Sequence, residues 1–292
     1  MINIRLAYCD LDCPTASSVM HFPDYFDDQD IDTDTASGFN IFSDPPGYYP
    51  SSPKSTSETY TLASGHAVNI RLVGHSPLWG HHLWNAGRVI SKYFEKNQEL
   101  VRGKTVLELG AGAGLPSLIC AHLGAERVVV TDYPDLNLID NLRLNIENFV
   151  HESNGDNMEI MKDRIVEEGY CWGADCQALL DHLPSIQGEM RPGFDIIIMA
   201  DVLFNHSEHQ KLVITLQKTL KKSASATAFV FFTPYRPWLL DKDLSFFDLL
   251  QANHMKYEKI LEEKMDQVMF EKDRGDEELR KTVFGYIVKW KL

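Results

Sequence analysis

Short apolar runs alternate with amphipathic segments along the chain from about residue 67. A strand buried on both faces of a parallel sheet is continuously apolar, and the segments that fit this description are 104–109, 127–131, 194–200 and 226–233. Apolar residues recur at helical spacing around these runs, over residues 83–94, 116–123, from about 135 onward, 207–221 and 241–253. This alternation predicts an α/β fold with a Rossmann-like, doubly wound sheet.

Both ends of this region carry shorter patterns. Residues 67–73 alternate between polar and apolar, which is typical of a strand. Residues 256–265 and 282–291 read as two closing strands. They predict an antiparallel C-terminal hairpin at one edge of the sheet.

The N-terminal part has a different composition. Residues 1–60 hold ten acidic residues and two basic ones, and the stretch SDPPGYYPSSPKSTSETY is rich in proline and serine. So few apolar groups do not offset the entropy lost on ordering a chain. We therefore predict a mostly disordered extension over residues 1–58 and one folded domain over residues 59–292.

The charge balance narrows the class of partner. The 292 residues include 28 basic and 42 acidic ones, a net charge of −14, which argues against non-specific nucleic-acid binding and against docking on anionic membranes. No apolar run is long enough for a transmembrane helix, and the first residues lack the apolar core of a signal peptide. Five sparse cysteines, without convincing zinc spacing, predict a cytoplasmic protein with no metal.

A glycine-rich turn follows the first buried run. In the segment ELGAGAGLPS, Gly110 and Gly112 allow the backbone to approach a ligand closely, and the helix after them presents free N–H groups. Asp132 comes 22 residues after Gly110, at the end of the next run. A carboxylate in that place can accept two hydrogen bonds from a ribose diol.

Two nucleotide cofactors fit such a turn. The dinucleotide fingerprint is G-x-G-x-x-G, whereas Leu115 stands here where the third glycine would be. This favours S-adenosylmethionine over a nicotinamide dinucleotide, although glycine spacing by itself leaves both open. An NAD-dependent oxidoreductase on the same fold is therefore one alternative.

Longer strings around the turn resemble a known family. ELGAGAGLPS followed by TDYPD looks like a class I, seven-stranded S-adenosylmethionine-dependent methyltransferase. The strings RLVGHSPLWGHHLWNAG, GYCWG, DVLFNHSEHQKL and FTPYRPWLLDKDLSFF occur in this order. They resemble the fungal family of elongation factor 1-alpha methyltransferases, formerly described as nicotinamide N-methyltransferase-like, over about residues 40–292.

The resemblance implies an activity and a cofactor site. Members of that family methylate the exposed N-terminal glycine of elongation factor 1-alpha and then the adjacent lysine. Carried over motif by motif, the residues expected to bind S-adenosylmethionine are Trp84, Gly110, Ala111, Gly112, Asp132, Trp172 and Ala200. The family's motif after the fourth strand reads Asp201-Val-Leu-Phe204, and Phe204 lacks the hydroxyl of the tyrosine that is common there in the wider superfamily.

Each of these residues has a physical reason for its role. An aromatic ring such as Trp172 would stack on the adenine. Asp201, at the end of a buried run, would accept a hydrogen bond from the incoming amine and so position it. Aromatic walls tolerate the cationic, methylated products. We expect the residues that line the substrate to be Phe204, Asn205, Tyr235 and Trp238.

Two further alternatives stay open. The same fold serves small-molecule N-methyltransferases that act on a pyridine or an amine, and the older family description points to that class. A non-catalytic binding module would also keep the fold. We expect a monomer, because the sequence shows no heptad pattern and no large apolar stripe.

Overall fold

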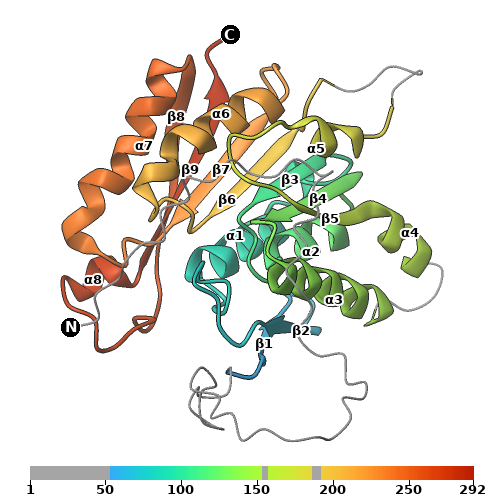
Figure 1. Ribbon diagram of the computed structural model, residues 1–292, viewed down its shortest axis with the longest axis horizontal. Helices are drawn as coiled ribbons and strands as arrows, with labels where there is room; N and C mark the ends of the chain where they lie inside the picture. Colours follow the sequence, from blue (N-terminus) through green and yellow to red (C-terminus); the bar gives the residue numbers. More distant parts are fainter. Residues whose placement is uncertain (1–52, 153–156, 186–191) are drawn as a thin grey trace, which may run out of the picture. The chain divides into compact units, whose positions relative to one another are not determined.

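The computed structural model describes residues 53–152, 157–185 and 192–292 (Figure 1). Most of the predicted extension over residues 1–58 lies outside these ranges. Strand β1 (Thr56–Thr61) begins three residues before the predicted domain start and pairs with β2 (Ala67–Leu72) in an antiparallel ribbon. None of the described helices is long and apolar enough to cross a membrane.

A seven-stranded sheet forms the centre of the domain, in the order β5-β4-β3-β6-β7-β9-β8. The first five strands of this order are parallel, and β9 runs antiparallel to both of its neighbours. The strand bounds are β3 Thr105–Leu109, β4 Arg127–Asp132, β5 Ile165–Gly169, β6 Ile196–Ala200, β7 Thr227–Phe232, β8 Met255–Lys264 and β9 Thr282–Trp290. The predicted doubly wound sheet with an antiparallel C-terminal hairpin is confirmed.

Helices cover both faces of the sheet (Figure 1). One apolar core receives side chains from α1 to α4 and the other from α5 to α7, and successive residues of a strand such as Val128 and Val129 enter opposite cores. The bounds are α1 Asn85–Lys96, α2 Leu115–His122, α3 Leu136–Glu152, α4 Asn157–Arg164, α5 Gln177–Asp181, α6 His209–Thr219, α7 Leu240–Ala252 and α8 Glu277–Arg280.

The sequence pattern did not predict β1, β5, α4, α5 or α8. Strand β5 reads IVEEG, and only its first residue is fully buried. It forms one edge of the sheet, so polar side chains are tolerated there and no continuous apolar run marks the strand.

The connectivity places one crevice at the middle of the sheet. From β3 the chain moves outward through β4 and β5, and it then returns to β6 on the other side of β3. A ligand crevice opens at the carboxyl ends of the strands where the order reverses in this way. The turn after β3 and the turn after β6 therefore meet at the crevice.

Candidate active site

The glycine turn after β3 has no room for a side chain at its first position. Gly110 has a φ of +70°, and a Cβ atom there would lie 2.9 Å from Val202 Cγ1 and 3.0 Å from Trp172 Cζ2. A larger residue is excluded by both backbone conformation and contact. Gly110 thus brings the Trp172 ring and the start of the β6 turn onto the glycine turn.

Asp132 ties the glycine turn to the end of β4. Its Oδ2 accepts a 2.6 Å hydrogen bond from the Gly112 N–H, and its Oδ1 accepts one of 2.7 Å from the Tyr133 N–H. The Ala111 N–H donates to the Thr131 carbonyl at 2.9 Å. Burial raises the pKa of Asp132 to about 6. Each carboxylate oxygen keeps one lone pair for a further donor.

Open space adjoins the glycine turn at its second position. Gly112 has a φ of +57°, and a Cβ atom built there would meet no atom within 4 Å. This space lies beside the N–H that Asp132 holds. The arrangement suits a ligand that approaches the backbone and offers hydroxyl donors to a carboxylate, as a ribose does.

The structure brings five of the seven predicted cofactor residues to this crevice, namely Gly110, Ala111, Gly112, Asp132 and Trp172. The other two, Ala200 and Trp84, lie near Asp201. Ala200 ends β6 directly before Asp201, and Trp84 directly precedes α1.

Asp201 is held by two separate segments of the chain, the start of α1 and the residues after β7. Its Oδ2 accepts a 2.9 Å hydrogen bond from the Ala86 N–H and a 3.4 Å one from the Tyr235 hydroxyl. Its Oδ1 accepts a 2.7 Å hydrogen bond from the Thr233 N–H. The residue has a φ of +53° and is 8% exposed. Burial raises the pKa of this carboxyl to about 7.

This carboxyl takes the place of a local helix cap. Trp84, the N-cap of α1, makes no side-chain capping hydrogen bond, and Asp201 supplies one from 115 residues away. An acidic group at a helix N-terminus also meets the positive end of the helix dipole. Asp201 therefore joins α1 to the ends of β6 and β7. Oδ1, which has a single donor, keeps a lone pair for a further one. Direct contact of Asp201 with a substrate amine remains a prediction.

A cluster of aromatic rings lies beside Asp201. The Tyr235 ring is 5.0 Å from that of Trp84 and 5.9 Å from that of Phe270, and Trp84 and Phe270 are 5.8 Å apart. The remaining members, Trp79 and His82, also contact Trp84. We call these five residues the aromatic cluster. Of these five residues, only Trp84 and Tyr235 were predicted from the sequence, although the string that contains Trp79 and His82 is rich in aromatic residues.

The other residues predicted to line the substrate lie at an exposed rim. Phe204 is 39% and Trp238 49% exposed. The Phe204 carbonyl accepts a hydrogen bond from the Arg236 guanidinium, and the guanidinium of Arg274 lies 4.6 Å from the centre of the Trp238 ring. The side-chain oxygen of Asn205 accepts a 2.8 Å hydrogen bond from a neighbouring serine hydroxyl. Tyr235 thus contacts Asp201, whereas Phe204 and Trp238 are exposed and Asn205 is half-buried. That these residues line the substrate remains a prediction.

A buried glutamate near the end of β3 binds the helix that follows the glycine turn. Glu108, 1% exposed, accepts hydrogen bonds through Oε2 from the backbone N–H of Ser117, at 3.0 Å, and from the Ser117 hydroxyl. Burial raises the pKa of Glu108 from 4.5 to about 8. The side chain is therefore mostly protonated at neutral pH.

The substitution Glu108→Gln is expected to raise the free energy of unfolding at pH 9 by roughly 1–3 kcal/mol. A folded pKa above the ordinary value means that the stabilisation by the protonated form is complete below about pH 4 and is lost as the pH rises to 8. Glutamine carries no charge, and its oxygen still accepts both hydrogen bonds from Ser117. Urea unfolding of both proteins at pH 5 and pH 9 checks this; an equal gap at the two values would contradict it.

The sequence model of a family described as lysine methyltransferase matches residues 74–253, which is more than half of the chain. The chain belongs to this family. It is 49% identical over 263 residues to the protein N-terminal and lysine N-methyltransferase of Neurospora crassa, covering 90% of this chain and 91% of that one. The Schizosaccharomyces pombe protein of the same description is 42% identical, with coverage of 85% and 94%.

The chain was also compared with solved structures. TYW2 from Pyrococcus horikoshii, solved in complex with MeSAdo, is 16% identical, with a TM-score of 0.47 and coverage of 82% of this chain and 73% of that one. Within the residues that the structure describes, no group of three His, Cys, Asp or Glu side chains could hold a metal ion.

S-adenosylmethionine is the cofactor of this methyltransferase, as predicted, and the crevice fits it. The open space at Gly112 admits a ligand against the backbone, and Asp132 offers free lone pairs to a ribose diol. Membership of the lysine methyltransferase family decides against the oxidoreductase alternative.

Proposed function

We propose that this methyltransferase modifies the N-terminal α-amine and the adjacent lysine of a protein, and that the protein is elongation factor 1-alpha. The observation that carries the proposal is the 49% identity, over 90% of the chain, to a protein N-terminal and lysine N-methyltransferase. The substrate itself comes from the resemblance of four ordered sequence strings to the elongation factor methyltransferases.

In methyl transfer, the main role of the protein is to position two groups, the methyl group of the cofactor and the attacking amine. Bound S-adenosylmethionine supplies a methyl group on a positively charged sulfur, which is an activated leaving group. The attacking amine must be neutral and aligned, and alignment supplies much of the acceleration in such a displacement. At pH 7 an α-amine is roughly 10–20% neutral, whereas a lysine is less than about 0.1% neutral. The terminal amine is therefore the easier first acceptor.

The site residues divide between the two groups. The glycine turn, Asp132 and Trp172 would hold the cofactor through backbone contact, the ribose hydroxyls and adenine stacking. Asp201 acts as a positioning residue, because it fixes α1 and Tyr235 at the place where the amine enters. The rings of Trp84 and Tyr235 would stabilise a cationic, methylated product by cation–π attraction.

The rim supports a protein substrate over a small amine. Four exposed apolar side chains lie on the loops that follow β2, β6 and β7, namely Leu78, Trp79, Phe204 and Trp238. Exposed apolar groups around a polar centre are typical of a surface that binds another protein. A closed pocket for a pyridine would not need them.

The deciding experiment follows labelled methyl groups. The chain is incubated with labelled S-adenosylmethionine and unmethylated elongation factor 1-alpha, and mass spectrometry locates the label, with Asp132→Ala as the cofactor-site control. Label on the terminal glycine and the next lysine, lost in the control, is the expected result. A parallel reaction contains nicotinamide in place of the protein. Label on nicotinamide and none on the protein would overturn the protein substrate, and cofactor binding without transfer would indicate a binding module. Monomeric state and cytoplasmic location remain predictions.

A further inference from the structure

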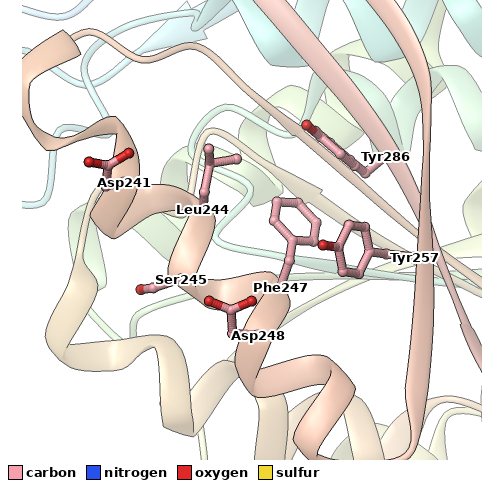
Figure 2. A pocket seen from close by; sticks show the side chains of 7 residues that line it. All are labelled: Asp241, Leu244, Ser245, Phe247, Asp248, Tyr257 and Tyr286. Atoms are coloured by element: carbon pink, nitrogen blue, oxygen red, sulfur yellow. The ribbon is translucent and has the colours of Figure 1, made fainter.

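A cavity of about 400 Å³ lies between α7 and the C-terminal hairpin, apart from the residues of the candidate active site (Figure 2). Its α7 wall consists of Asp241, Leu244, Ser245 and Asp248. These residues have the spacing i, i+3, i+4 and i+7, so they form one face of the helix. The opposite wall consists of aromatic rings.

The aromatic wall joins α7 to the two hairpin strands. The Phe247 ring is 4.7 Å from the Tyr257 ring of β8 and 4.4 Å from the Tyr286 ring of β9. Tyr257 pairs with Val288, so Tyr286 is its diagonal neighbour on the same face of the sheet. Figure 2 shows both tyrosine hydroxyls pointing from the strands toward α7. The wall therefore offers ring surface and two hydroxyl groups to the same space.

The residues that line the cavity favour a cationic ligand. Two carboxylates stand on the helix wall, and none of the seven lining residues is basic. The faces of aromatic rings attract ammonium and guanidinium groups, and more strongly where water is excluded. A bound cation would also relieve the repulsion between Asp241 and Asp248, which lie about 10 Å apart along the helix axis.

The cavity adjoins the proposed substrate entrance along the chain. Asp241 follows the rim residue Trp238 by three positions, and both belong to the segment that leaves β7. One end of the cavity, at Asp241, is therefore within one helical turn of the proposed substrate-lining residue Trp238, so a protein bound at Trp238 can also reach the cavity. The net charge of −14 favours a partner with basic segments.

We propose that this cavity is a docking site for a lysine or arginine side chain of the protein substrate, separate from the amine that is methylated. The proposal rests on the proposed function, since it takes the occupant to be part of that substrate. Docking at a distance from the reacting amine would raise the affinity for the whole protein without changing the chemical step.

The binding test uses the full chain and a tetralysine peptide. Ring signals of Tyr257 and Tyr286 are followed by NMR during titration of the peptide. The variants Asp241→Asn with Asp248→Asn, and Tyr257→Leu, are expected to weaken binding about three- to tenfold. Glu258→Gln is the matched control, because it removes a charge from the next residue of β8, on the opposite face of the strand. An equal loss in the control, or no shift of either ring, would overturn the proposal.

The kinetic test compares two substrates of different length. In the double aspartate variant, KM for full-length elongation factor 1-alpha is expected to rise about three- to tenfold, with kcat unchanged. KM for a short peptide that carries only the substrate's N-terminus should stay as in the wild type. An equal rise in KM for both substrates would place the effect in the active site and would contradict the docking site. If the wild type methylates neither substrate, the proposed function fails, whereas the peptide titration still decides whether the cavity binds cations.

Discussion

The substitution Asp201→Ala is expected to reduce methyl transfer at saturating cofactor by about 100-fold or more and to lower the free energy of unfolding by roughly 2–4 kcal/mol. Two backbone N–H groups, those of Ala86 and Thr233, would lose their acceptor in a buried place. Tyr235 and the start of α1 would then lose their fixed positions beside the entrance. Urea unfolding and single-turnover methyl transfer measure the two effects.

The variant Asp201→Asn separates the hydrogen bonds from the charge. Its amide oxygen accepts one of the two N–H groups, but its NH₂ faces the other, so stability should fall less than in the alanine variant. The folded pKa of about 7 lies above the ordinary 3.8, so the wild type loses stability as the pH rises from about 4 through 7. Asparagine should not contribute to that slope. Full activity of Asp201→Ala would contradict the positioning role.

The second large effect is expected at Asp132. The substitution Asp132→Ala should weaken binding of S-adenosylmethionine about 10- to 100-fold, because hydrogen bonds to a charged group contribute roughly 1.5–3 kcal/mol. The Gly112 N–H would also lose its 2.6 Å acceptor, and the turn would no longer be held to β4 by that side chain. Isothermal titration of the cofactor measures the change directly.

Asp135→Ala is the matched control for this experiment. Asp135 stands three residues later in the same loop, is exposed, and accepts a hydrogen bond from the Leu138 N–H at 3.1 Å in the first turn of α3. Loss of this side-chain hydrogen bond should lower the free energy of unfolding by about 1 kcal/mol. It should leave the affinity for the cofactor within about twofold of the wild type. Equal losses of affinity in the two variants would show that Asp132 acts only through the stability of the loop.

The meeting of the glycine turn and Asp132 was largely predictable, because each directly follows an apolar run and the two runs form neighbouring parallel strands. Glycines at Gly110 and Gly112 directly follow an apolar run, and Asp132 directly follows the next one. Parallel neighbouring strands must place their carboxyl ends at one edge. Local pattern and spacing therefore suffice to bring these residues together.

The aromatic cluster was only partly predictable for the opposite reason. Phe270 comes from the loop before α8, yet its ring is 5.8 Å from that of Trp84. Nothing in the neighbouring residues of Phe270 marks it, because the contact depends on how the C-terminal hairpin folds back over the sheet. The cavity between Asp248 and Tyr257 depends on the same packing.

By itself, the sequence determined the α/β class, the antiparallel hairpin and the place of the glycine turn, since each follows from apolar periodicity and glycine conformation within short segments. Only the tertiary structure decided the partners of Asp201. A motif can place a carboxylate at the end of β6, but a helix 115 residues away decides which N–H groups it accepts. Long-range packing sets those partners, and it fixes the position of α1 and Tyr235 around this carboxylate.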